Sequence, residues 1–116
     1  MNIRVLVADD HTIVREGLRM ILEAQSGITV VGEAADGREA VQRAAELTPD
    51  VIVMDINMPE LNGVEATRRI LEQDAKARVI IVSTQLSSAY VARALRAGAR
   101  GYLPKTANAA ELVTAV

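Results

Sequence analysis

Five polar residues follow closely on short apolar runs, and their side chains could do chemistry together if the runs were neighbouring strands. They are Asp9, Asp10, Asp55, Ser83 and Lys105. Apolar runs with few polar interruptions are typical of strands buried on both faces of a parallel sheet. The carboxyl ends of such strands meet at one edge of the sheet, where open α/β folds bind their ligands. We therefore expect three carboxylates, a hydroxyl and an ammonium on one rim.

The chemistry that this set favours is metal-assisted phosphoryl transfer. Carboxylates held a few ångströms apart repel one another, and a hard cation such as Mg²⁺ or Mn²⁺ relieves the repulsion. A carboxylate beside such a cation is a competent nucleophile toward phosphorus, and Asp55, which stands alone after its run, is the natural acceptor. Lys105 and Ser83 would then bind the phosphoryl oxygens. Because only the phosphorylated state satisfies both, the site is predicted to be a switch.

Each of these residues also has a plainer interpretation. An aspartate after a strand is more often a turn former or a helix cap, and a lone lysine is usually a solvated surface charge. The phosphoryl-transfer hypothesis depends on convergence, since four separate strand ends deliver the residue types that it needs. His11 is interpreted as a loop or first-turn residue rather than as a metal ligand, because oxygen-rich sites prefer hard cations.

The elements that must position these residues alternate along the chain. Strands are predicted at Ile3–Ala8, Ile28–Ala34, Val51–Met54, Val79–Val82 and Gly101–Leu103, with the second and fifth at the edges. Helical periodicity lies between them, and Asp36, Asn62 and Asn108 each stand three residues before a glutamate, which is typical of a helix start. Five βα repeats predict an α/β fold, a doubly wound five-stranded parallel sheet of order 2-1-3-4-5 with helices on both faces.

Composition fits one α/β domain and disfavours several other classes of protein. The chain has 116 residues, half of them hydrophobic, and its only aromatic residues are two tyrosines, so the core must be aliphatic. A net charge of -2 gives no excess of positive charge for binding nucleic acid or an anionic membrane. The chain has no cysteine and no apolar stretch of the roughly 20 residues that a membrane span needs, which favours a cytoplasmic location. The last helix is short, so we expect residues 1–116 to be one domain cut from a longer protein.

In detail the sequence resembles the receiver domains of two-component response regulators. The resemblance runs through essentially the whole chain, in VLVADDH, VVGEAADGREA, VIVMDINMPELNGVEATRRI, VIIVST and ALRAGARGYLPK. It is nearest to the NarL/FixJ type, whose receivers precede a LuxR-type helix-turn-helix DNA-binding domain. The resemblance implies the flavodoxin-like receiver fold and a phosphorelay role in transcription regulation, as a phosphorylation switch rather than an enzyme.

The resemblance also implies a phosphorylation site and a Mg²⁺ site. Asp55 is the implied phosphoacceptor. Asp10 and Asp55 would bind the ion directly, together with the backbone carbonyl of Asn57, while Asp9 would act mainly through water. Mn²⁺ is the alternative ion for the same oxygen ligands.

The resemblance also implies residues that respond to the phosphorylated state and residues that limit its lifetime. Ser83 and Lys105 would contact the phosphoryl oxygens. Tyr102 matches the aromatic switch position of the family, and it is equally compatible with an edge-strand ring packed on the last helix. Asn57 and Gln85 stand where the family tunes access of hydrolytic water. Since neither amide can activate water, we expect slow-to-intermediate autodephosphorylation.

The partners that the resemblance implies are a sensor histidine kinase, as phosphodonor, and a second copy of the chain. Homodimerisation on phosphorylation would use the face of the fourth helix, fifth strand and fifth helix, or the first and fifth helices. DNA would be reached only through a C-terminal domain that this sequence does not contain, and no membrane contact is expected.

Three other functions compete with the phosphorylation switch. A phosphohydrolase that forms an aspartyl phosphate needs a second carboxylate two residues after the nucleophile, where this chain has Asn57. A flavodoxin-like FMN binder needs a phosphate-binding loop after the first strand, where Asp9 and Asp10 would repel the phosphate. A pseudo-receiver that only dimerises is disfavoured because the acidic and basic positions are all filled.

Overall fold

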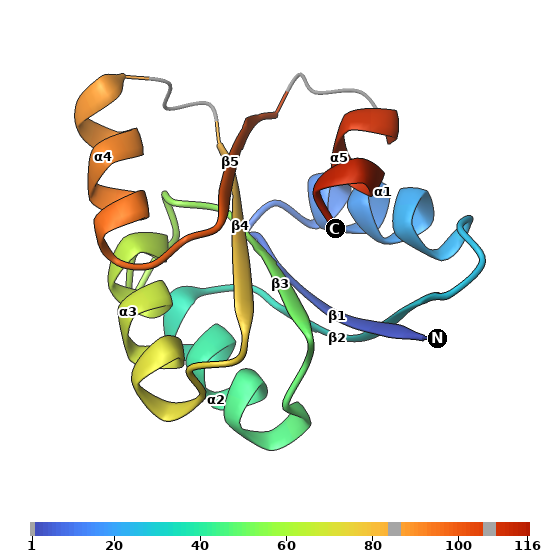
Figure 1. Cartoon of the computed structure of the whole chain (residues 1–116), viewed down its shortest axis with the longest axis horizontal. Helices are drawn as coiled ribbons and strands as arrows, with labels where there is room; N and C mark the ends of the chain where they lie inside the picture. The colour runs from blue at the N-terminus through green and yellow to red at the C-terminus, as the bar shows by residue number, and fades with distance from the viewer. Residues whose placement is uncertain (1, 84–86, 106–108) are drawn as a thin grey trace.

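Strands and helices alternate along the computed structural model, which describes residues 2–83, 87–105 and 109–116 (Figure 1). The strands are β1 (Ile3–Ala8), β2 (Ile28–Ala34), β3 (Val51–Met54), β4 (Arg78–Ser83) and β5 (Gly101–Pro104). The helices are α1 (Thr12–Glu23), α2 (Gly37–Leu47), α3 (Gly63–Gln73), α4 (Ser88–Arg96) and α5 (Ala109–Ala115). The predicted strands are confirmed, although β4 is one residue longer at each end and β5 includes Pro104. Ser83 and Pro104 pair with each other, and the edge position of β5 tolerates the proline.

The strands form one parallel sheet of order β2-β1-β3-β4-β5, which is the predicted order. At the centre of the sheet, Ala8 of β1 pairs with Met54 of β3, and Met54 pairs with Ile81 of β4. These strands therefore end at nearly the same level. The backbone N–H of Asp55 continues the ladder by donating to the carbonyl of Ala8 at 2.9 Å. The acidic residues that follow β1 and β3 are thereby neighbours.

Helices cover both faces of the sheet, with α1 and α5 on one side and α2, α3 and α4 on the other (Figure 1). Because side chains alternate along a strand, each central strand contributes to two cores. Val53 packs with Leu22 and Leu112 on the first side, whereas Met54 packs with Ile70 on the second. The buried residues of both cores are Ala, Val, Leu, Ile and Met, as the composition predicted. None of the helices within the described ranges is long and apolar enough to cross a membrane.

Two helix starts carry the caps that the sequence predicted. The Asp36 side chain accepts from the N–H of Glu39 at 2.7 Å at the start of α2, and Asn62 accepts from the N–H of Glu65 at 3.0 Å at the start of α3. Each cap of this kind contributes about 1 kcal/mol. The third predicted start, at Asn108, lies outside the described residues.

The start of α3 lies against the end of β3. The N–H of Gly63 donates to the carbonyl of Ile56 at 2.8 Å. A Cβ atom at this position would overlap the backbone carbonyl of Asp55. Glycine therefore allows the helix to begin directly beside the predicted phosphoacceptor.

Candidate functional site

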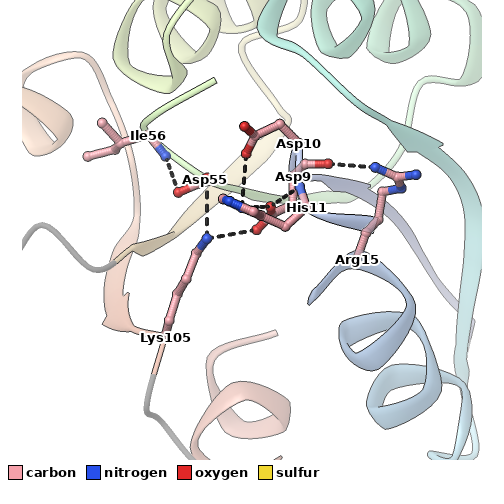
Figure 2. A network of polar contacts seen from close by, with 7 residues as sticks. All are labelled: Asp9, Asp10, His11, Arg15, Asp55, Ile56 and Lys105. Carbon is pink, nitrogen blue, oxygen red and sulfur yellow. Dashed lines mark hydrogen bonds and ion pairs between the residues drawn. The ribbon is translucent and has the colours of Figure 1, made fainter. Parts of the chain in front are cut away.

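Three aspartates lie together at the carboxyl ends of β1 and β3 (Figure 2). One oxygen each of Asp9, Asp10 and Asp55 and one ring nitrogen of His11 all lie within 4.8 Å of one another. Asp9 is 1% exposed and Asp55 is 3% exposed. Burying an ionised carboxylate is costly unless positive charge compensates it. The cluster therefore needs a cation, of the protein or bound to it.

Lys105, which follows β5, supplies one positive charge. Its Nζ lies 3.2 Å from Oδ2 of Asp9 and 3.3 Å from Oδ2 of Asp55 (Figure 2). Burial alone would lower the pKa of Lys105, but the charges of Asp55 and Asp9 outweigh burial and raise this pKa. The ammonium therefore stays protonated and holds both buried carboxylates.

Asp55 is oriented by the backbone of the next residue. Its Oδ1 accepts a hydrogen bond from the N–H of Ile56 at 2.9 Å, while Oδ2 accepts from Lys105 (Figure 2). The pKa of Asp55 is raised, first by burial and then by the nearby charge of Asp9, against the lowering effect of Lys105. One ammonium thus leaves the repulsion between the two buried carboxylates incompletely compensated.

Asp10 has a buried carboxylate oxygen, Oδ1, that accepts no hydrogen bond from the described residues. The Nδ1 of His11 lies 3.1 Å away but is not aligned for a hydrogen bond. An unsatisfied carboxylate oxygen beside two buried carboxylates fits a hard cation with oxygen ligands. His11 is the N-cap residue of α1, and its exposed ring lies 3.2 Å from Asp9.

Arg15 on α1 is a part of the site that sequence reasoning missed. Its Nη1 donates to the backbone carbonyl of Asp9 at 2.7 Å, and its Nε donates to Glu33 of β2 at 3.0 Å. Arg19 reaches the other oxygen of Glu33 at 2.7 Å. Burial would raise the pKa of Glu33, but the hydrogen bonds from Arg19 and Arg15 outweigh burial and lower it. Arg15 therefore ties the turn that carries Asp9 and Asp10 to the edge of the sheet.

Ser83 and Tyr102, which are predicted to respond to the phosphorylated state, lie near this cluster. Ser83 is buried at the end of β4, and its carbonyl accepts from the backbone N–H of Lys105 at 3.1 Å. The pKa of Tyr102 is raised by burial and by the charge of Asp55, while a hydrogen bond with Ser83 acts in the opposite direction. The Tyr102 ring packs against the core of α2, α3 and α4, not on the last helix as its plainer interpretation had it. Asn57 is exposed in the loop after β3, and Gln85 lies outside the described residues.

Comparison with known proteins identifies the family. Residues 5–116 match the family described as response regulator receiver domain. This chain belongs to that family. The receiver domain is 46% identical over 114 residues to the transcriptional regulatory protein LiaR of Bacillus subtilis (strain 168), covering 98% of this chain and 54% of LiaR. It spans about half the length of the curated relatives that it matches.

Solved structures agree with the receiver fold. A two-component response regulator of the LuxR family from Aurantimonas sp. SI85-9A1 has a TM-score of 0.93 and 45% identity, over 98% of this receiver domain and 81% of that chain. A CheX-CheY-BeF₃-Mg²⁺ complex from Borrelia burgdorferi has a TM-score of 0.92 and 30% identity, over 97% of this receiver domain and 85% of that chain. The predicted resemblance, including its LuxR-type branch, is confirmed.

Membership of the receiver family also discriminates between the competing functions. Receiver domains are regulatory switches, and the relatives of this one are named as regulators rather than as enzymes. The predicted switch is therefore favoured over the phosphohydrolase and the flavin binder.

Proposed function

We propose that this receiver domain accepts a phosphoryl group on Asp55 in a Mg²⁺-dependent reaction and thereby controls a DNA-binding domain elsewhere in its protein. The observation that carries the proposal is the buried Asp55 carboxylate, which shares the ammonium of Lys105 with Asp9 and lies beside the unsatisfied oxygen of Asp10. This arrangement holds more negative charge than the described residues neutralise, which suits a site that recruits a divalent cation before it reacts.

The metal would be held by Asp10, Asp55 and the backbone carbonyl of Asn57, with Asp9 acting through water. All of these ligands are oxygens, as Mg²⁺ and Mn²⁺ prefer. When bound, the ion screens the charge of the phosphoryl oxygens as they approach the carboxylate. The Borrelia CheX-CheY complex, which contains BeF₃ and Mg²⁺, supports this assignment by analogy.

The protein's own residues prepare the attack. The N–H of Ile56 holds Oδ1 of Asp55, so Oδ2 is the oxygen presented for the reaction. Oδ2 forms a bond to phosphorus while the bond from phosphorus to the donor's oxygen or nitrogen breaks, and the leaving group departs with that electron pair. Lys105, already 3.3 Å from Oδ2, then pairs with the new phosphoryl oxygens.

Ser83 and Tyr102 would report the change. The buried Ser83 hydroxyl would bind a phosphoryl oxygen, which alters its hydrogen bond with Tyr102 and so the packing of that ring. The modified state ends by autodephosphorylation at a slow-to-intermediate rate, since the amides Asn57 and Gln85 offer no group to activate water. A sensor histidine kinase in the cytoplasm is the proposed donor, and phosphorylation is proposed to favour a homodimer.

Intact-mass analysis after incubation with acetyl phosphate and Mg²⁺ tests the proposal. The wild type should gain one phosphoryl group that hydroxylamine removes, whereas Asp55→Asn should gain none. Asp74→Asn, the same substitution at the C-cap of α3 on the other end of the sheet, is the matched control and should react like the wild type. A folded wild type that binds Mg²⁺ but gains no mass would overturn the proposal.

A further inference from the structure

A polar cavity lies between α3 and α4, beside the loop after β3, which contributes Ile56 and Asn57 to its lining. These helices are neighbours on one face of the sheet (Figure 1). The cavity has a volume of about 470 Å³, and its lining includes Arg68 from α3 and Arg93 and Arg96 from α4. Known sites for small molecules have volumes of roughly 300–1,000 Å³. The volume of this cavity therefore lies in the range of known small-molecule sites.

The lining is positive although the chain is negative. Three arginines against one glutamate, Glu65, leave two positive charges around the cavity, whereas the whole chain has a net charge of -2. Arg68 donates to Glu65 at 2.8 Å. Neither Arg93 nor Arg96 forms an ion pair with a carboxylate among the described residues. The excess positive charge is therefore available to a ligand.

The remaining lining distinguishes this cavity from a bare cluster of charges. The Arg93 guanidinium lies 5.9 Å from the centre of the Tyr90 ring, which holds it against the wall of the cavity. Asn62 adds a polar side chain, and Ile56 and Val64 add apolar surface for the uncharged part of a ligand. Arginines in the last turn of a helix also favour its C-terminal dipole, but that role explains neither the cavity nor Arg68 opposite.

We infer that this cavity binds a phosphorylated small molecule through Arg68, Arg93 and Arg96. Guanidinium groups bind phosphate through paired hydrogen bonds, and two excess positive charges match the charge of a phosphate or diphosphate group. A nucleic acid would need a broad basic surface on a chain that is acidic overall. The inference does not depend on phosphorylation of Asp55, although Ile56 and Asn57, the two residues after the acceptor, line the cavity.

Calorimetric titration with ADP and with inorganic pyrophosphate tests the inference, and EDTA excludes binding through a metal ion at the neighbouring aspartates. We expect saturable one-to-one binding. A higher affinity for ADP would indicate a nucleotide-like ligand, whereas equal affinities for ADP and pyrophosphate would indicate that only the phosphates are recognised. The double variant Arg93→Gln/Arg96→Gln should weaken binding roughly a hundredfold, since each charge-assisted contact is worth about tenfold. Both residues are exposed, so folding should be retained and is checked by circular dichroism.

The matched control is Arg78→Gln/Arg100→Gln, which removes the same charge from two exposed arginines outside the cavity, near each other at the opposite end of the sheet. It should leave binding unchanged. Equal weakening by both double variants, equal affinity for hexaglutamate, or no binding of either probe at millimolar concentration would overturn the inference. Asp55→Asn should bind both probes like the wild type, so failure here is distinguishable from failure of the phosphorylation site.

Discussion

The ammonium of Lys105 lies 3.3 Å from Oδ2 of Asp55, the carboxylate oxygen that is not bound by the N–H of Ile56. The same ammonium lies 3.2 Å from Asp9, so one side chain compensates two buried carboxylates. A divalent cation at the aspartates would take over part of this role. The position of Lys105 therefore links the stability of the protein to metal binding.

Replacing Lys105 with Met should lower the stability of the metal-free protein. Breaking a buried ion pair leaves carboxylates uncompensated, and we expect a loss of about 2–4 kcal/mol in the free energy of unfolding in EDTA. Saturating Mg²⁺ should then raise the melting temperature of the variant by more than it raises that of the wild type. Thermal unfolding with and without Mg²⁺ measures both effects, and Lys76→Met, at an exposed position, is the control. Equal Mg²⁺ responses in all three proteins would contradict the prediction.

Glu33→Gln should destabilise the protein in a pH-dependent way. The pKa of Glu33 is lowered in the folded state, because hydrogen bonds from Arg19 and Arg15 outweigh burial. A lowered pKa contributes stability above the ordinary value of 4.5, and this contribution is lost as the pH falls through the folded-state pKa. The variant should therefore melt below the wild type at pH 7, by about 1 kcal/mol or less, and approach it below pH 4.5. Glu46→Gln, an exposed control, should show no such trend; a constant difference at all pH values would refute the assignment.

Arg15→Ala should weaken Mg²⁺ binding without removing a ligand. Arg15 holds the backbone carbonyl of Asp9, and groups that orient metal ligands typically contribute about tenfold to affinity. Arg15→Lys should restore only part of the loss, since one ammonium cannot donate in the forked geometry of a guanidinium. Mg²⁺ titration followed by NMR measures the affinity. Arg19→Ala, which loses the same partner Glu33 but does not touch Asp9, separates a positioning role from a general loss of stability.

Two glycine substitutions should change the free energy of unfolding in opposite directions. Gly63→Ala would push α3 away from the carbonyl of Asp55 and should cost about 2 kcal/mol or more, together with slower phosphorylation by acetyl phosphate. Gly17→Ala places its methyl group where no atom lies within 4 Å, inside α1, and should stabilise the protein by about 0.5–1 kcal/mol. Denaturant unfolding measures both. A stabilising Gly63→Ala would show that the helix start has room to move.

The strand ends were predictable because apolar runs and parallel pairing place Asp9 and Asp55 at one edge without any knowledge of side-chain packing. The caps at Asp36 and Asn62 were predictable because they depend on residues only three positions apart. Arg15 and Glu33 were not, since their contact joins a helix and a strand through tertiary packing, and nothing in their spacing marks it. The core against which Tyr102 packs was also missed, because the register of a four-residue edge strand decides it. The cavity between α3 and α4 depends in the same way on how two helices pack.

The contact between Asp55 and Lys105 spans 50 residues of sequence and crosses from the third strand to the fifth. During synthesis, the aspartates emerge from the ribosome well before the lysine that compensates them. Until β5 docks, the aspartates after β1 and β3 lack the ammonium of Lys105, and their negative charge attracts that ammonium toward the sheet. The proposed phosphorylation site is therefore complete only when the edge strand is in place, because the central strand supplies the acceptor and the residue after the edge strand supplies the ammonium.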